Sequence, residues 1–391
     1  MNLVFYTNYL NHHQVLVADE LYHLLGDGFC FVATLPHNEK ELKGGADYST
    51  RSYCILAAES DSAHEKALYM AREADACVFG ACSQVYAVER AKKNPNGLSF
   101  EMGERWLKHG WLTIGSPVFR KWAWNYYCYL RKANFYKLCC SSFTAGDDER
   151  LNAYKGRHYK WGYFTSVDNH FGETSLQEVN TKMKVRFLWC ARFLRLKHPE
   201  LVIRLASRLK EDGYDFAIEM YGDEGYLAQH DRIYKRNDLE ILIQQLGVKD
   251  VVTLKGNRPN NEILKAMQDG DIFLFTSDHL EGWGAVLNEA MSNGCAVVAS
   301  DAIGAVPYLV KDGENGMVFK SESIDSLTEK VIYLLDHPIE RNLMAAKAYR
   351  TMHDVWSPEN ATRNLLQLID DLQHGRETSI VEGPCSKASY I

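Results

Sequence analysis

Short apolar runs, each about the length of one buried strand, alternate with helix-length segments along most of the chain. Uninterrupted apolar runs are typical of strands that helices cover on both faces, and such strands form parallel sheets. The alternation stops over a polar segment and then starts again, which predicts an α/β protein with two doubly wound domains. The expected strands are 2–7, 29–34, 53–58, 76–81, 97–102 and 137–142 in the first series, and 185–190, 215–222, 251–256, 271–277, 295–300 and 316–319 in the second.

The same pattern predicts the domain boundaries. Ser357 is placed to act as an N-cap, and Pro358 would occupy the first helical position, where proline is tolerated. After this last helix no apolar period is left, which is typical of a loose terminus. The predicted parts are an N-terminal domain (1–168), a linker (169–184), a C-terminal domain (185–356), a last helix (357–373) and a flexible tail (374–391).

The composition excludes several classes of protein. The 391 residues carry a formal net charge of −7, which argues against a nucleic-acid-binding protein. The 10 cysteines form no C-x-x-C pair and most lie in apolar runs, so we expect reduced thiols in a cytoplasmic protein, not disulfides or a zinc site. The N-terminus does not resemble a signal peptide, and no apolar window reaches the ~18–20 residues of a membrane span.

The segment "HLEGWGAVLNEAMSNGCAVVAS" (279–300) follows a predicted strand and carries two acids and two early glycines. Gly282 and Gly284 let the backbone approach a ligand closely, and the helix start that follows presents free amides that suit a phosphate. Glu281 and Glu289 would repel phosphate, so their natural partners are hydroxyl groups. The segment therefore fits a sugar nucleotide, or else a solvated loop whose acids stabilise the helix dipole.

This segment resembles the E-x7-E motif of the retaining GT-B glycosyltransferases of family four, whose usual form is "EGFG…EAM-A-G-PVV". Four other elements of that family match in the expected order, and the resemblance covers residues 185 to about 373. The resemblance is weaker in the N-terminal half, which holds the acceptor in this family. The four elements are "CARFLRLKHP" (190–199) for the "GR…K" element, "YGDEG" (221–225) for the G-x-G turn, "VVTLKG" (251–256), and "GAVPYLVKDGENGMVF" (304–319).

The sequence departs from the family pattern at three places. Ala191 replaces the glycine before Arg192, and Tyr308 replaces the usual glutamate after proline. The loop after the first strand, "NYLNHHQ" (8–14), is not a glycine-rich turn.

The resemblance implies a GT-B fold, with two Rossmann-like domains facing across a cleft and the last helix crossing back to the first domain. Arg192 and Lys197 would act in catalysis by clamping the donor diphosphate and stabilising the charge that builds on it. Glu281 would bind sugar hydroxyls and Glu289 the ribose. The leaving phosphate would accept the acceptor's proton, so no protein nucleophile is needed. The further donor-binding residues implied are Gly222, Asp223, Gly282, Trp283, Gly284 and Ala285.

Candidate acceptor residues lie after two strands of the first domain. Asn11, His12 and His13 follow the first strand and form a polar cluster that suits an acceptor or a phosphate, although a histidine there is often structural. Glu101 lies at the end of another strand, where it would bind the acceptor or pair with an arginine.

"DGD" (269–271) has the spacing of the metal motif of the other large glycosyltransferase fold. Here it joins a predicted helix to a predicted strand, and two short acids are common in such turns. We therefore expect neither a bound metal nor a cofactor.

Residues 105–137 hold seven Lys and Arg, no acid, and ten aromatic residues, including four of the eight tryptophans. In a helix, one face would carry an aromatic stripe that packs on the core, as such stripes usually do. Basic residues mixed with Trp and Tyr also suit the surface of an anionic membrane, and we favour a peripheral contact there. The stripe consists of Trp122, Tyr126, Tyr129, Ala133 and Tyr136.

Together these features predict a retaining, metal-independent glycosyltransferase of polysaccharide biosynthesis. It would move a sugar from a nucleotide-sugar donor to a glycan or polyprenyl-linked acceptor, at the inner face of the plasma membrane. A sugar-nucleotide epimerase with the same fold and a non-catalytic sugar-nucleotide-binding protein are the alternatives. The set of Arg192, Lys197, Glu281 and Glu289 argues against the second of these.

Overall fold

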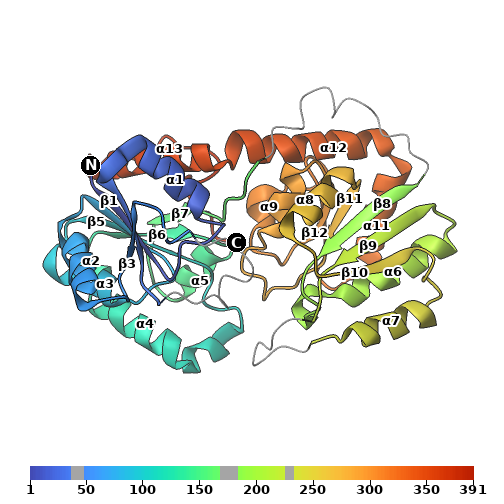
Figure 1. Cartoon of the computed structure of the whole chain (residues 1–391), viewed down its shortest axis with the longest axis horizontal. Coiled ribbons are helices and arrows are strands. Elements are labelled where there is room, and N and C mark those ends of the chain that lie inside the picture. Colours follow the sequence, from blue (N-terminus) through green and yellow to red (C-terminus); the bar gives the residue numbers. More distant parts are fainter. Residues whose placement is uncertain (37–47, 168–183, 225–232) are drawn as a thin grey trace. The chain divides into compact units, whose positions relative to one another are not determined.

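The computed structural model describes residues 1–36, 48–167, 184–224 and 233–391. It divides into two compact units, one of residues 1–165 and 355–391, and the other of residues 166–354 (Figure 1). Each unit contains one parallel sheet with helices around it, so the predicted α/β class is confirmed. Apart from residue 184, the predicted linker lies outside the described residues.

The first unit is built on seven parallel strands in the order β3-β2-β1-β4-β5-β6-β7. The order reverses beside β1, which pairs with both β2 and β4. The strands are β1 Leu3–Thr7, β2 Phe29–Ala33, β3 Cys54–Leu56, β4 Ala76–Phe79, β5 Leu98–Gly103, β6 Phe135–Cys139 and β7 His158–Lys160. The helices are α1 Val15–Leu25, α2 Asp61–Glu73, α3 Val85–Lys93, α4 Pro117–Cys128, α5 Thr144–Arg150 and α13 Pro358–Gln373, with short 3₁₀ turns η1 Gly26–Gly28, η2 Gly110–Gly115 and η3 Leu130–Lys132.

The second unit has six parallel strands in the order β10-β9-β8-β11-β12-β13. Here the order reverses between β8 and β11, and ligands of such sheets bind beside that point. The strands are β8 Val185–Cys190, β9 Phe216–Tyr221, β10 Val252–Gly256, β11 Ile272–Phe275, β12 Ala296–Ser300 and β13 Met317–Phe319. The helices are α6 Pro199–Glu211, α7 Arg236–Gln245, α8 Asn260–Asp269, α9 Val286–Ser292, α10 Val306–Leu309, α11 Ile324–Asp336 and α12 Pro338–Arg350, with the 3₁₀ turn η4 Arg195–Lys197; the π-helix η5 Thr351–Val355 follows α12.

Every predicted strand is present, with bounds that differ by at most a few residues. All residues of β1, β11 and β12 are buried, because helices cover both faces of the sheets. Strand β7 was not predicted, since its residues, His158, Tyr159 and Lys160, form no apolar run. Among the described residues, no helix is both long enough and apolar enough to span a bilayer.

The predicted aromatic stripe is wrong beyond its first two members. Helix α4 ends at Cys128, so only Trp122 and Tyr126 lie on it, and both are buried in the core. The chain then turns through η3 and enters β6, which contains Tyr136. The helical period continues in the sequence past the point where the sheet requires the chain to become a strand.

The C-terminal segment differs from the predicted flexible tail. Helix α13 begins as expected, with the Ser357 hydroxyl accepting a hydrogen bond from the amide of Asn360 at 3.2 Å, and it packs beside α1 (Figure 1). Beyond it, Cys385 is fully buried, and residue Lys387 forms an antiparallel bridge with Tyr159. Since β7 is the edge strand of its sheet, this segment covers backbone groups that would otherwise be unpaired.

Candidate active site

Three loops of the second unit meet at one edge of its sheet. They follow β9, β8 and β11, which are neighbours in that order. Because the carboxyl ends of parallel strands share one edge, residues far apart in the sequence are brought together there. The predicted donor residues lie on these loops: Gly222 and Asp223 after β9, Arg192 and Lys197 after β8, and Glu281, Gly282, Trp283, Gly284 and Ala285 after β11.

The loops after β8 and β9 touch backbone to backbone. Gly222 has a φ of +134°, and a Cβ at this position would overlap the carbonyl oxygen of Ala191. The amide of Phe193 donates a hydrogen bond to the carbonyl oxygen of Asp223 at 3.0 Å. Glycine is therefore required at position 222, whereas the alanine that replaces the family's glycine at 191 is accommodated.

The loops after β8 and β11 are joined by Thr276. Its hydroxyl donates to the carbonyl oxygen of Lys197 at 2.6 Å and accepts from the indole of Trp189 at 3.0 Å. The amide of Asp278 also donates to the carbonyl oxygen of Leu196 at 2.9 Å. These bonds fix the backbone of Lys197 against the loop that carries Glu281.

Lys197 and Glu281 form an ion pair in which the side chains are 13% and 14% exposed, respectively. The hydroxyl of Ser277 donates a further hydrogen bond to the same carboxylate at 3.1 Å. Glu281 therefore orients the ammonium group of Lys197 when no ligand is bound. Arg192 is exposed and makes no ion pair with another described residue, so its guanidinium is free to meet an anion.

His198 and Asp278, which the sequence analysis did not single out, support Lys197 from its other side. His198 has a left-handed φ of 48°, and its ring nitrogens lie 2.8 Å from Glu200 and 3.4 Å from Asp278. Burial lowers the pKa of His198, but hydrogen bonds to Asp278 and Glu200 have the larger effect and raise the pKa above its ordinary value, to about 9. The sequence does give one signal for His198, which is its position between the candidate Lys197 and the proline that starts α6.

Glu289 lies on the seven-residue helix α9 and is half-buried. Burial raises the pKa of its carboxyl group to about 7, while a hydrogen bond from Asn260 opposes this rise. Burial also raises the pKa of the Cys190 thiol to about 12; Glu289 adds to this effect and Lys197 opposes it. The carboxyl group of Glu289 and the ammonium group of Lys197 therefore both lie close enough to Cys190, at the end of β8, to interact with it electrostatically.

The turn before α9 depends on tight packing. Gly284 has a φ of +88°, and a Cβ there would overlap the ring of Phe275. The side chain of Trp283 is buried, with its indole donating to Asn288 at 2.9 Å and its ring 6.2 Å from that of Tyr308. This side chain belongs to the core, so only the backbone of Trp283 is left to take part in ligand binding.

The D-x-D sequence lies at the opposite edge of the same sheet, where β11 begins. The Asp271 carboxylate accepts a hydrogen bond from the amide of Arg186 at 2.8 Å, and Asp269 pairs with Lys265 at 3.4 Å. A Cβ on Gly270 would overlap the side chain of Leu188. These residues form a packed helix–strand turn, away from the strand ends that carry Glu281.

The N-terminal candidates follow β1 in the first unit. The side chain of Asn11 accepts a hydrogen bond from the amide of His13 at 3.0 Å, which closes the turn into α1. The ring of His13 stacks on Tyr163 at 5.5 Å, and the ring of the exposed His12 lies 3.8 Å from that of His13. Asn11 is thus used locally, while His12 faces solvent.

Glu101 borders a cavity of about 730 Å³ in the first unit, at the carboxyl ends of β4 and β5. Its carboxylate pairs with Lys137 at 2.7 Å, not with an arginine, and accepts hydrogen bonds from Trp122 and Tyr154. Trp106 also lines the cavity, with its ring 4.8 Å from that of Trp122. The volume is typical of a small-molecule site.

The profile of the family described as "Glycosyl transferases group 1" matches residues 173–351, the segment that holds all of the predicted donor residues. The matched segment is slightly less than half of the chain, so the likeness to this family applies to residues 173–351. The fold and the strand-end site of the second unit are thereby linked to a family whose members are named for glycosyl transfer.

Several proteins similar to this chain carry specific names. The chain is 30% identical over 160 residues to the D-inositol 3-phosphate glycosyltransferase of Corynebacterium aurimucosum, covering 40% of this chain and 36% of the relative. It is 24% identical over 197 residues to the putative colanic acid biosynthesis glycosyltransferase WcaL of Salmonella typhimurium, covering 49% and 46%. It is 27% identical over 186 residues to the N-acetylgalactosamine-N,N'-diacetylbacillosaminyl-diphospho-undecaprenol 4-alpha-N-acetylgalactosaminyltransferase of Campylobacter jejuni, covering 47% of each. Each match spans less than half the length of the relative.

Solved structures support the fold over almost the whole chain. Anabaena HepE in complex with UDP has a TM-score of 0.69 at 14% identity and covers 95% of this chain and 100% of that one. The apo form of the lipopolysaccharide outer core galactosyltransferase WaaB has a TM-score of 0.65 at 13% identity and covers 96% and 99%. At this identity the likeness shows the fold alone, and it confirms the predicted GT-B class.

Glu289 should make the stability of the folded chain depend on pH. Its folded-state pKa of about 7 lies above the ordinary 4.5, so the folded chain holds the proton more tightly than the unfolded chain. The free energy of unfolding therefore falls by about 3 kcal/mol as the pH rises through this window. Glu289→Gln should remove that fall, so the variant gains stability relative to the parent between pH 4.5 and 7.5.

Urea unfolding followed by tryptophan fluorescence at several pH values measures this difference. Glu329→Gln, which changes an exposed glutamate of the same unit, is the matched control and should run parallel to the parent. Parallel curves for Glu289→Gln as well would contradict the assignment.

Proposed function

We propose that this chain transfers a sugar, with retention of configuration, from a nucleotide-sugar donor to a glycan acceptor in polysaccharide biosynthesis. The convergence of Arg192, Lys197, Glu281 and Glu289 at one sheet edge carries this proposal. Cations suit a diphosphate, and carboxylates beside them suit the hydroxyls of a sugar and a ribose. The structures of HepE with UDP and with UDP and glucose support a donor of this class.

In the proposed reaction, the bond between the anomeric carbon and the diphosphate breaks while the acceptor hydroxyl bonds to the same face of that carbon. Negative charge builds on the diphosphate, where Lys197 and Arg192 stabilise it. The acceptor's proton passes to a leaving phosphate oxygen, so neither a protein nucleophile nor a separate base is required. Glu281 then has two roles, since it holds Lys197 before donor binding and takes sugar hydroxyls afterwards.

The cavity beside Glu101 is the acceptor site in this proposal. The indole nitrogen of Trp106 is buried and has no acceptor among the described residues, so a ligand oxygen would satisfy it. The aromatic rings of Trp106 and Trp122 suit the apolar face of a sugar. The name of the Campylobacter relative, which contains a diphospho-undecaprenol, supports a polyprenyl-linked glycan as the acceptor.

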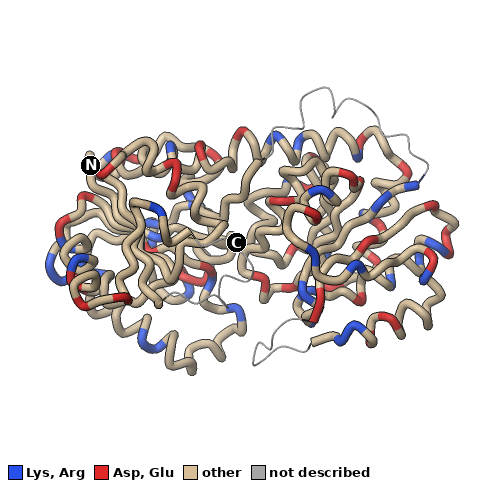
Figure 2. Tube along the Cα trace, in the orientation of Figure 1, with Lys and Arg blue, Asp and Glu red and all other residues tan. Residues whose placement is uncertain are grey.

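We further propose peripheral contact of residues 105–137 with an anionic membrane, on its cytoplasmic side. Three cations of this segment are already paired: Arg105 with Asp147, Lys108 with Glu104 and Lys137 with Glu101. The other four make no ion pair with any described residue, and α4 shows basic but no acidic positions (Figure 2). Exposed apolar residues lie among them. The four cations are Arg120, Lys121, Arg131 and Lys132, and the exposed apolar residues include Trp111, Leu112, Ile114, Val118, Trp124 and Tyr127.

Lys197→Ala should lower kcat for donor hydrolysis or transfer by about 10²–10³, because one stabilising donor of this kind contributes ~2.7–4 kcal/mol. Arg192→Ala should act in the same direction. Arg195→Ala is the matched control, since Arg195 is an exposed cation of the same turn and should leave kcat unchanged. Turnover is measured with a panel of sugar nucleotides, where inversion at C2 without transfer would indicate an epimerase, and unchanged turnover in Lys197→Ala would remove the catalytic assignment.

Activity should persist in EDTA, because Lys197 and Arg192 supply the positive charge and Asp269 and Asp271 lie at the wrong edge of the sheet. Among the described residues, one group offers ligand atoms within 4.8 Å of one another: His198, Asp278 and Glu322. In this group Glu322 is exposed, and His198 already pairs with Asp278 and Glu200. Loss of activity in EDTA, with rescue by Mg²⁺ or Mn²⁺, would contradict this proposal.

The protein should sediment with anionic vesicles and less with zwitterionic ones, since each basic residue near an anionic surface contributes ~1 kcal/mol. High salt should release it, because this attraction is screened. Charge reversal at Arg120, Lys121, Arg131 and Lys132 together should abolish vesicle binding and leave donor hydrolysis intact. If the protein fails to bind anionic vesicles at low salt, the membrane part of the proposal falls and the glycosyl transfer part stands.

A further inference from the structure

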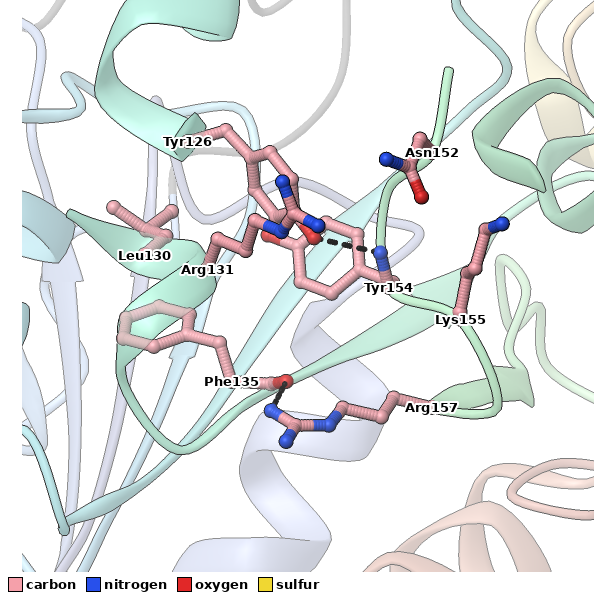
Figure 3. Close-up of a pocket in the computed structure, with 8 residues that line it drawn as sticks. All are labelled: Tyr126, Leu130, Arg131, Phe135, Asn152, Tyr154, Lys155 and Arg157. Atoms are coloured by element: carbon pink, nitrogen blue, oxygen red, sulfur yellow. Dashed lines mark hydrogen bonds between the residues drawn. The ribbon is translucent and has the colours of Figure 1, made fainter. Parts of the chain in front are cut away.

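A second, smaller pocket of the first unit lies at the opposite edge of its sheet from the acceptor cavity. It has a volume of about 180 Å³ and is found where β6 begins and before β7 starts (Figure 3). A water molecule occupies about 30 Å³ of liquid, so the pocket has room for a group of several heavy atoms. No step of the proposed glycosyl transfer uses it.

Three cations line this pocket, and none of its described lining residues is acidic. Arg131 comes from η3 on one side, while Lys155 and Arg157 come from the loop before β7 on the other (Figure 3). Convergence of cations from two segments, without a carboxylate among them, is typical of a site for a phosphate or another anion.

The positive charge in the pocket is largely uncompensated. Among the described residues, Arg157 donates to the carbonyl oxygens of Ala133 and Phe135, at 3.4 and 3.3 Å, which fix its guanidinium without cancelling its charge. Arg131 makes no ion pair with a described residue, and its guanidinium lies 5.9 Å from the ring of Tyr127. Lys155 lies 3.5 Å from Glu149, but both side chains are about half exposed and such pairs contribute little.

The loop that carries Lys155 and Arg157 is held in a defined shape. Asn152 and Tyr154 both have left-handed φ angles, of 53° and 47°. The amide of Tyr154 donates to the hydroxyl of Tyr126 at 2.7 Å, which ties the loop to α4 (Figure 3). Two non-glycine residues in this conformation persist only where the surroundings fix them, so the backbone that carries Lys155 and Arg157 is fixed before any ligand arrives.

The pocket adjoins the exposed face of α4. The hydroxyl of Tyr127 donates to the carbonyl oxygen of Leu151, next to Asn152 of the pocket loop. Tyr127 and Trp124 are 36% and 66% exposed, and Val118, nearer the start of the same helix, is 69% exposed. An apolar helix face with a cationic pocket at its end matches the interface of a bilayer, where acyl chains and phosphates lie close together.

We propose that the pocket binds the phosphate of an anionic lipid headgroup, with Arg131, Lys155 and Arg157 as its ligands. This extends the membrane contact proposed above from a general attraction to a defined site. The shared chemistry is that of a phosphate ester. The exposed Tyr127, whose ring lies 5.9 Å from the guanidinium of Arg131, and Trp124, one turn before it on α4, favour a lipid over a soluble phosphate as its source. A headgroup bound here, together with the apolar face of α4, would fix how this unit is oriented on the bilayer.

The test compares two neighbouring charges. Arg131→Gln removes a cation that lines the pocket, whereas Lys132→Gln removes an exposed cation next to it that does not. On phosphatidylglycerol-containing vesicles, Lys132→Gln should weaken binding about fivefold, as expected for one charge in the membrane field. Arg131→Gln should weaken it about twentyfold or more, because charge-assisted hydrogen bonds to phosphate are also lost. Arg157→Gln should match Arg131→Gln, with thermal unfolding as the check that it folds.

Soluble phosphate distinguishes the sources. Glycerol 3-phosphate and inorganic phosphate, titrated without vesicles, should bind the parent only weakly. Tight binding of either that depends on Arg131, with equal vesicle losses in Arg131→Gln and Lys132→Gln, would assign the pocket to a soluble anion and overturn the lipid proposal. Equal losses without such binding would show that only net charge matters, and would also overturn it. If the parent does not bind vesicles at all, this proposal and the membrane contact fail together, and glycosyl transfer is judged on donor turnover alone.

Discussion

Thr276 holds together the two loops on which the candidate donor site depends. Its buried hydroxyl donates to the carbonyl oxygen of Lys197 and accepts from the indole of Trp189, at 2.6 and 3.0 Å. Since Thr276 follows β11 and Lys197 follows β8, one side chain fixes the spacing between neighbouring strand ends. The topology of the sheet therefore brings Lys197 next to Glu281. The ion pair forms between two backbone segments whose spacing the hydrogen bonds of Thr276 already fix.

The fold was largely predictable because burial on both faces leaves a signal in the sequence. A strand such as β12 is buried at every position and apolar at all but its last residue, Ser300, and such runs are visible without knowledge of their partners. What failed was decided by long-range packing. The bridge between Lys387 and Tyr159 covers the edge of β7. Neither β7 nor the C-terminal tail has a hydrophobic period in the sequence that would predict this pairing. In the same way, β6 ends the apparent helical period after Cys128.

The donor site was predictable for a different reason, which is that backbone contacts demand particular residues. Gly222 and Gly284 occupy positions where a Cβ would overlap Ala191 or Phe275, so the chain must show glycine there. The contacts of unit one leave no such trace. Glu101 meets Lys137 across 36 positions and Arg105 meets Asp147 across 42, and many other side chains would satisfy the local sequence equally well. His198 escaped notice because one of its two acidic partners, Asp278, comes from the distant loop after β11.

The cation-rich segment shows how the same long-range pairing changes the meaning of a charge pattern. Counted along the chain, 105–137 carries seven cations and no acid, yet acids outside it, at Glu101, Glu104 and Asp147, neutralise three of them. These three pairs lie toward the buried side and stabilise the cavity wall. The four unpaired cations lie on α4 and η3, where Trp122 and Tyr126 face the core and Trp124 faces solvent. Folding thus separates cations and aromatic residues that are mixed in the sequence. Only the exposed cations and exposed aromatic residues are available to a membrane.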